Sequence, residues 1–249
     1  APNNAVLVMT GKFDKTAVLK QIEHEFGSIN QQNLPKPAAK VAFNLSQLKQ
    51  REFHVAKGSD YLKLNFYMQR KQQALTDAMN FAPYLYSLEP TGKLYTPLVE
   101  SGLATGVLSL DASDQERNIA VMAAVYSPQQ DAKAIDQALI EQVEAPAKFS
   151  DAEVARIQQM QKNAMETSLK SASSMLNILT HYVVNREGQW SAYFSDYARL
   201  QSLKAEPLNQ ALSKLLQPQH RIDATIEPTP EHEKTAAKVV ELLRQTQSQ

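Results

Sequence analysis

The stretch Tyr61-Leu62-Lys63-Leu64-Asn65-Phe66-Tyr67-Met68 has the alternating side-chain pattern of a β-strand. Its apolar side carries Leu62, Leu64, Phe66 and Met68. A second alternating run, Arg51–Lys57, precedes it and places Phe53 and Val55 on one face. Gly58-Ser59-Asp60 between the two runs is typical of a turn. The sequence therefore predicts two successive strands joined by a turn.

The segments that follow predict a second strand pair and then mostly helices. Val107–Leu110 and Ile119–Tyr126 have strand length and are joined by a polar segment. Apolar residues recur at helical spacing in the segments 74–88, 93–101, 131–143, 174–185 and 206–216. Pro83 should kink or interrupt the first of these helices. Ser150-Asp151-Ala152-Glu153 resembles a capping box that opens one more long helix.

The two ends of the chain follow a similar pattern. Near the start, the strand-like run Ala5–Met9 precedes Asp14, which can cap a helix that ends at Gly27. Near the end, the strand-like run Arg221–Glu227 precedes a helix that begins at Glu231. The two patterns are 216 residues apart (218 minus 2, counted from the proline before each strand). If they are repeats, the period is a whole domain.

Residues 28–50 lack periodicity, and Pro35 and Pro37 within them disfavour helix. We therefore predict that residues 1–30 are the last strand–helix unit of a preceding domain. Residues 31–50 would be a connector, and residues 51–249 a second domain. The first residues, Ala1-Pro2-Asn3-Asn4, do not look like a signal peptide or a natural start. We therefore expect a fragment or a processed product.

Composition excludes several classes of protein. Lysine plus arginine and aspartate plus glutamate number 26 each, so the net charge of zero argues against a nucleic-acid partner. Hydrophobic residues make up 43 % of the chain, which is enough for a buried core. The chain has no cysteine, which excludes disulfides and cysteine-ligated metals. No apolar run approaches the ~20 residues that a membrane span needs.

No catalytic centre is visible in the residue pattern. The histidines are His24, His54, His181, His220 and His232. No two of them stand three or four residues apart, so the sequence holds no helical zinc pair. His24 and His232 are expected on solvated helix surfaces, and His54 and His181 are expected to be structural. No serine stands in a Gly-x-Ser-x-Gly motif, and the glycines form no phosphate-binding loop.

An aromatic group in the last third of the chain has two interpretations. Trp190, Tyr193, Phe194 and Tyr197 would form either a recognition patch or a helix face packed into the core. We expect the core, because burial of such rings stabilises a fold by roughly 1.5–3 kcal/mol each. In that case Trp190→Ala should cost about 3–5 kcal/mol.

Several ordered motifs together resemble the pitrilysin/insulinase family of zinc metallopeptidases. The run Asn4–Asp14 resembles a family junction with a Pro-x-Asn-Ala strand and a Gly-x-Phe-Asp turn. Thr91–Tyr95 with Gly102-Leu103-Ala104 resembles a Ser-Gly-Arg-Leu helix that leads into Gly-Leu-Ala. Gly188-Gln189-Trp190 with Tyr193-Phe194 and Arg199-Leu200 resembles a Gly-Asp-Trp…Phe-Phe…Arg-Leu stretch of the long bacterial members. The Pro218 strand resembles the piece that follows.

The resemblance implies an α+β fold. Its mixed, mostly antiparallel sheet would be packed with helices, as in the mitochondrial processing peptidase and metallohydrolase-like domains. In the family, zinc is held by an inverted His-x-x-Glu-His helix in another domain. A quite different domain of the enzyme holds the substrate with an arginine and, seven residues later, a tyrosine. The matching positions here are Leu98 and Thr105, so the resemblance implies the non-catalytic domain.

The resulting prediction is a zinc-free domain that shapes the peptide chamber of a metallopeptidase. It has no catalytic or metal-binding residue of its own, and its substrate-binding residues stay unknown. Zinc belongs to the preceding catalytic domain, and the other expected partners are a second half or subunit and a peptide substrate. The long bacterial relatives imply a periplasmic location. The alternative is an assembly or binding module without a protease partner, like the core subunits of the respiratory bc complexes.

Overall fold

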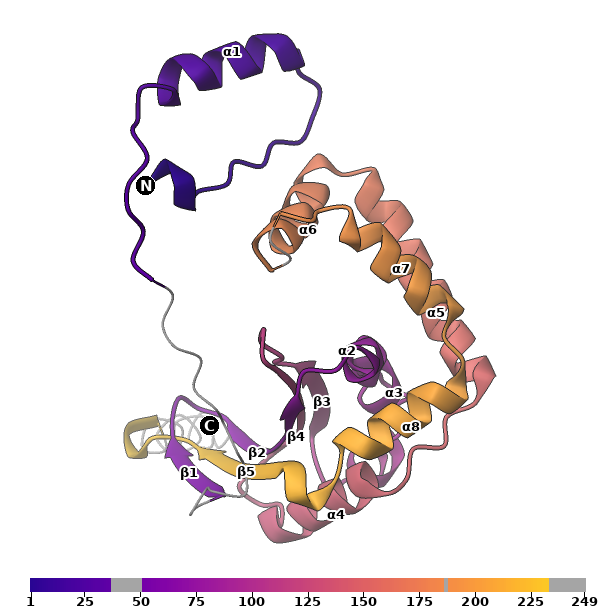
Figure 1. Ribbon diagram of the computed structural model, residues 1–249. Coiled ribbons are helices and arrows are strands. Elements are labelled where there is room, and N and C mark those ends of the chain that lie inside the picture. The colour runs from indigo at the N-terminus through magenta and orange to yellow at the C-terminus, as the bar shows by residue number, and fades with distance from the viewer. Residues whose placement is uncertain (37–50, 186–187, 233–249) are drawn as a thin grey trace, which may run out of the picture. The chain divides into compact units, whose positions relative to one another are not determined.

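A five-stranded sheet organises the part of the chain that the computed structural model describes, residues 1–36, 51–185 and 188–232 (Figure 1). Across the sheet the strands are β1 (Glu52–Ala56), β5 (Arg221–Glu227), β2 (Tyr61–Arg70), β4 (Arg117–Tyr126) and β3 (Gly106–Asp111). Only β1 and β5 run parallel, and every other neighbouring pair is antiparallel. The predicted fold class, a mixed and mostly antiparallel sheet packed with helices, is confirmed.

The chain divides into two compact units, which are described separately. One comprises Ala1–Phe43 and Gln158–Ser202, and the other comprises Asn44–Ile157 and Leu203–Gln249. Helices of the first unit are α1 (Lys15–Phe26), α6 (Ala172–Asn185) and α7 (Ala192–Ser202), and α5 (Asp151–Leu169) belongs mostly to it. The second unit contains the sheet and the helices α2 (Gln73–Met79), α3 (Ala82–Tyr86), α4 (Ala132–Glu144) and α8 (Ala205–Leu215). The predicted domain boundaries at residues 30 and 50 stay a prediction.

Short helical turns complete the described elements: the 3-10 turns η1 (Pro2–Asn4) and η4 (Pro218–His220), and the π-helix η3 (Tyr95–Glu100). The predicted helix over 74–88 is interrupted, as Pro83 required, and becomes α2 and α3. Pro83 stands in the first turn of α3, where its missing N–H costs no helical hydrogen bond. Ser150 and Glu153 form the predicted capping box, and Asp14 and Asp131 cap α1 and α4.

The prediction of a strand at Ala5–Met9 is wrong, because the structure has no strand there. Ala5 has extended backbone angles, but a β-strand also needs a neighbouring strand to accept its ladder of hydrogen bonds. None of the described strands pairs with this segment, and Val6 and Leu7 are 66 % and 60 % exposed. The helix predicted from Glu231 falls largely outside the described residues. The predicted repeat of the strand–helix pattern at the two ends of the chain is therefore not compared further.

Strand β5 enters the sheet between the two strands that are consecutive in sequence. The predicted turn after β1 is present, with Gly58 at a φ of +67°. However, β1 and β2 do not pair with each other, because β5 lies between them in register with both. Leu62 and Phe53 thus both face β5 residues. The last described strand therefore completes the sheet that the first strands begin.

The two faces of the sheet differ in burial. Helices α2, α4 and α8 all contact one face, through hydrogen bonds to Asn118, Asn65 and Gln69 respectively. That face includes the fully buried Tyr67 and Met122. The opposite face carries the alternating apolar side chains of β2, which are only half-buried. The deeply buried core thus lies between the sheet and these helices.

This packing predicts different effects for two leucine truncations. Leu139 of α4 is 0 % exposed, whereas Leu110 of β3 is 54 % exposed. Leu139→Ala should lower the free energy of unfolding by about 2–5 kcal/mol, since it removes buried methyl groups and leaves a cavity. Leu110→Ala should change it by about 0.5 kcal/mol or less. Urea unfolding followed by circular dichroism measures both, and equal losses would contradict this position of the core.

A second prediction concerns the loop between β3 and β4. Asp114 Oδ1 accepts hydrogen bonds from the backbone N–H groups of Glu116 and Arg117, at 2.8 and 2.7 Å. The Arg117 guanidinium also binds this carboxylate and holds its pKa below the usual aspartate value. A lowered pKa means that the stabilisation is present above the pKa of the unfolded state and is lost as the pH falls through the folded-state pKa.

Asp114→Asn should therefore lower stability at pH 7, by about 1 kcal/mol at most because both side chains of the pair are more than one-third exposed. The difference from the original chain should shrink as the pH falls below about 4, where the carboxylate in the unfolded chain becomes protonated. Urea unfolding at pH 7 and pH 3 makes the comparison. A difference that grew at pH 3 would rule out this ion pair as its source.

Candidate functional site

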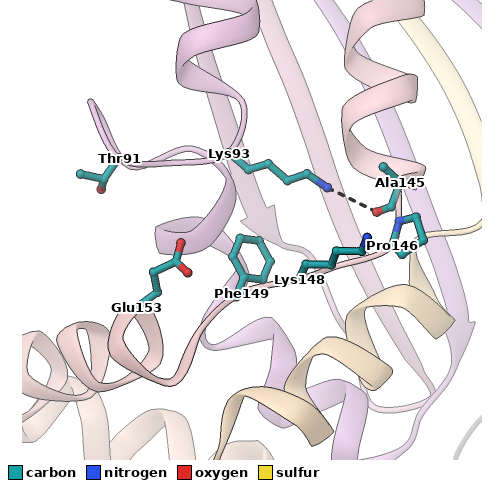
Figure 2. Close-up of a pocket in the computed structure, with 7 residues that line it drawn as sticks. All are labelled: Thr91, Lys93, Ala145, Pro146, Lys148, Phe149 and Glu153. Carbon is teal, nitrogen blue, oxygen red and sulfur yellow. Dashed lines mark hydrogen bonds between the residues drawn. The ribbon is translucent and has the colours of Figure 1, made fainter.

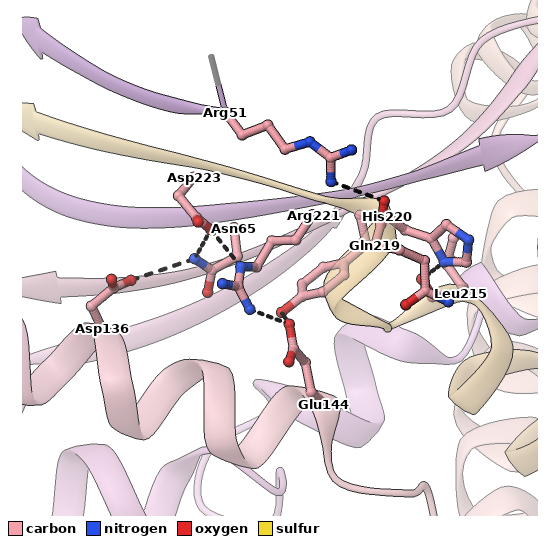
Figure 3. Close-up of polar contacts among 10 residues, drawn as sticks. Arg51, Asn65, Asp136, Glu144, Leu215, Gln219, His220, Arg221 and Asp223 are labelled. Atoms are coloured by element: carbon pink, nitrogen blue, oxygen red, sulfur yellow. Dashed lines mark hydrogen bonds and ion pairs between the residues drawn. The ribbon is translucent and has the colours of Figure 1, made fainter. Parts of the chain in front are cut away.

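A cluster of charged side chains joins β5 to α4 beneath the sheet (Figure 3). Arg221, the first residue of β5, forms an ion pair with Glu144 at the end of α4. Its Nε lies 2.8 Å from Oδ1 of Asp223 on the same strand. The Tyr67 hydroxyl of β2 also donates to Glu144, at 3.3 Å. One guanidinium thus balances two carboxylates that are about one-fifth exposed or less.

A buried asparagine extends this cluster along the sheet. The side-chain amide of Asn65, which is 0 % exposed, donates to Asp223 at 2.9 Å and to Asp136 of α4 at 3.5 Å. Asn65 and Tyr67 occupy the polar side of the alternation in β2, which in an antiparallel sheet usually faces solvent. Sequence reasoning therefore missed both residues. The pattern Arg221-Ile222-Asp223, with two charges on one side of a strand, was the available signal.

The electrostatics of the cluster favour a structural role over acid–base chemistry. Burial raises the pKa of Tyr67 far above its ordinary value, and the neighbouring Glu144 raises it further. Burial alone would lower the pKa of Arg221, but Asp223 and Glu144 outweigh it and raise that pKa. The phenol therefore stays neutral and the guanidinium stays charged near pH 7, so neither exchanges a proton in a working cycle.

The two positions that the resemblance implies for a substrate clamp lie close together in the chain but cannot act as one. Leu98 is 0 % exposed in the π-helix η3, with its side chain in the core. Thr105 is exposed just before β3, and its hydroxyl donates to the backbone carbonyl of Val125 at 3.0 Å. Neither side chain offers the charge or the phenol that would hold a peptide backbone.

The histidines stay dispersed over the described residues. His24, His54, His181 and His232 are exposed, and His220 is half-buried. The Nδ1 atom of His220 lies 3.1 Å from the carbonyl of Leu215 at the end of α8 (Figure 3). The same atom lies 3.0 Å from Gln69 Nε2, so this ring links α8 to β2. Within residues 1–36, 51–185 and 188–232, no three His, Cys, Asp or Glu side chains gather as metal ligands. No helix in these ranges is long and apolar enough to cross a bilayer.

The aromatic group corrects one expectation. Trp190 and Phe194 are 52 % and 37 % exposed, so they are not core residues as predicted. The rings contact one another instead, with centroids 5.2 Å apart for Tyr193 and Phe194 and 6.4 Å for Trp190 and Phe194. Helix α7 has no buried residue, although the Tyr193 ring also contacts Tyr182 of α6, with centroids 5.5 Å apart. Tyr193 and Tyr197 are half-buried.

A pocket of about 400 Å³ lies in the second unit, where the loop after α4 meets the start of α5 (Figure 2). Lys93, Lys148 and Glu153 supply its charges, and Phe149 supplies an aromatic wall. The Lys93 ammonium donates to the carbonyl of Ala145 at 3.3 Å. Sequence reasoning missed this site, since its residues come from two loops and the first turn of α5, which no periodic pattern connects.

Comparisons with known proteins agree with the fold. A family model described as the peptidase M16 inactive domain matches residues 1–161. No curated protein sequence matches the chain. A protease from Helicobacter pylori is similar in structure, with a TM-score of 0.70 and 18 % identity over 88 % of this chain and 54 % of that chain.

Two further solved structures are similar. The inactive peptidase domain of a Bordetella parapertussis protein has a TM-score of 0.62 and 22 % identity, over 73 % of this chain and 98 % of that chain. The periplasmic protease PqqL from Escherichia coli has a TM-score of 0.66 and 13 % identity, over 88 % of this chain and 25 % of that chain. At these identities the likeness shows the fold. The chain spans about half of the Helicobacter pylori protease and a quarter of PqqL.

The charged cluster yields a prediction about stability. Arg221→Met keeps most of the apolar stem but removes the cation that Glu144 and Asp223 share. It should lower the free energy of unfolding by about 2–3 kcal/mol, less than the ~3–5 kcal/mol seen for fully buried pairs, because these groups keep partial exposure. Arg70→Met, at the exposed end of β2, is the matched control and should change it by about 0.5 kcal/mol or less.

Thermal and urea unfolding measure both variants. Stability of Arg221→Met equal to that of the control would show that the cluster does not hold α4 to the sheet. A triple variant, Arg221→Met with Glu144→Gln and Asp223→Asn, tests the cause. Removing the carboxylate charges should recover part of the loss if unpaired charge is responsible.

Proposed function

Because the chain belongs to the family of the peptidase M16 inactive domain, we propose that it shapes the peptide chamber of a zinc metalloendopeptidase. The family match also confirms the resemblance to pitrilysin/insulinase peptidases. The family match over residues 1–161 carries this proposal. In this role the chain supplies wall and support. The zinc and the general base stand in the catalytic domain of the parent protein.

The residues at the clamp positions support a non-catalytic role. A substrate clamp needs cationic or phenolic donors that reach into a chamber. Leu98 instead lies in the core beneath η3, and the Thr105 hydroxyl donates a hydrogen bond to the backbone of β4. A catalytic zinc also needs about three protein ligands that converge on one point. The described residues hold no such group.

The size of the similar proteins supports a partner domain. The chain corresponds to about half of the Helicobacter pylori protease and a quarter of PqqL. A parent of that length has room for the catalytic domain and for a second half. PqqL is a periplasmic protease, and the same location is proposed for this chain. The peptide substrate is proposed from the family alone.

The proposal predicts an inactive chain that becomes part of an active enzyme. The purified 249-residue chain, dialysed against zinc, should retain no stoichiometric zinc and should not cleave a quenched fluorescent peptide. The parent protein should bind one zinc and cleave the peptide, with full loss on chelation and recovery on zinc addition. Metal analysis and fluorescence measure the two properties.

Two outcomes would overturn the assignment in different ways. One zinc per isolated chain, with chelator-sensitive cleavage, would make this domain catalytic. A parent protein that contains no zinc and cleaves nothing would favour the assembly module. The Arg221→Met variant of the parent serves as a stability control, because it should lower the melting temperature without removing zinc from the catalytic domain.

A further inference from the structure

We propose that the pocket between η3 and the start of α5 binds a carboxylate carried on an apolar body, as at the C-terminal residue of a peptide (Figure 2). Its volume, about 400 Å³, is in the range of small-molecule sites, which is ~300–1,000 Å³. Every lining residue belongs to the unit that contains the sheet. The chamber role proposed above neither requires this site nor depends on it.

The positive charge gathers at one end of the pocket. Figure 2 shows the side chains of Lys93 and Lys148 reaching toward the same end, beside Ala145 and Pro146. The Lys93 ammonium has three donors, and the carbonyl of Ala145 accepts from one of them. Burial lowers the pKa of Lys93, which means that its charge lacks full solvation. A bound carboxylate would supply the missing counter-charge.

The pocket walls are held in place before any ligand arrives. Asn209 of α8 donates to the carbonyl of Phe149 at 2.8 Å and accepts from its N–H at 2.9 Å. Ser213 of α8 accepts from the N–H of Ala147 at 2.9 Å. The ring of Phe149 also packs edge-on against Tyr86, with centroids 5.4 Å apart. A wall fixed in this way loses little freedom on binding, which favours affinity.

The backbone beneath Lys93 is also held in place, because it packs closely on α3. Gly92 precedes Lys93, and a Cβ atom at position 92 would lie 2.6 Å from the carbonyl oxygen of Tyr86. The N–H of Lys93 donates to the carbonyl of Leu85 at 2.8 Å. The backbone that carries this half-buried lysine is therefore packed directly on α3, so the root of the side chain is well defined.

The negative charge lies at the other end and selects among anions. Glu153 stands near Thr91, and its Oε2 is held by the hydroxyl and the N–H of Ser150, at 2.7 and 2.8 Å (Figure 2). A small, highly charged anion such as phosphate would bind less well, because the Glu153 carboxylate would repel it and the apolar wall would not solvate it. A peptide end fits better, because its carboxylate would face the lysines, its side chain Phe149, and its N–H groups Glu153.

Fluorescence anisotropy of the 249-residue chain tests the proposal with two labelled peptides of one sequence that ends in Leu-Phe. One peptide has a free carboxyl terminus and the other a C-terminal amide. The free acid should bind about tenfold more tightly, the value of one charge-assisted hydrogen bond. Lys148→Ala should weaken the free acid about tenfold and leave the amide unchanged. Lys133→Ala, an exposed lysine on α4 outside the pocket, is the matched control and should change neither.

Lys93→Met tests the second ammonium while keeping the apolar stem. It should also weaken the free acid about tenfold, with a melting temperature that confirms folding. Equal affinity for the acid and the amide would overturn the proposal, as would binding that Lys148→Ala does not change. Competition by inorganic phosphate as strong as by N-acetylphenylalanine would replace it with a general anion site.

Discussion

The guanidinium of Arg221 is the group on which the arrangement of the sheet depends. Three carboxylates and a buried amide meet between β5 and α4, and Arg221 is the cation placed among them. Without it, Glu144 and Asp223 would repel each other at the seam between helix and strand. With it, α4 is tied at both Glu144 and Asp136, and the helix covers the face of the sheet that holds the core. Burial of that core supplies most of the stability.

Local structure could be predicted from the sequence, and its assembly could not. Strands and helices follow from periods of two and 3.6 residues, so β2, β4, α4 and α8 appear close to their predicted limits. The position of β5 between β1 and β2 depends on pairs such as Asn65 and Asp223, which are 158 residues apart. No periodic signal spans that distance. The segment Ala5–Met9 shows the converse, since it has the pattern of a strand but pairs with none of the described strands.

The functional assignment came from ordered motifs, because the chemistry of single residues gave only exclusions. The scattered histidines and the side chains of Leu98 and Thr105 were readable from the sequence. The exposure of Trp190 was not, since an aromatic-rich helix looks the same whether or not a neighbour covers it. The pocket at Lys93 was also out of reach. It needs the loop after α4 to be fastened by Asn209 and Ser213, which follow more than 50 residues later.

The order of the strands has a consequence for synthesis. A ribosome releases β1 and β2 long before β5. The edges of β1 and β2 that pair with β5 in the folded chain therefore stay unpaired while some 150 further residues emerge. A strand of another chain could pair with these edges until residues 221–227 are synthesised. A chain that begins to fold only after its whole length has been released would avoid this exposure, because β5 would be present from the moment that collapse begins.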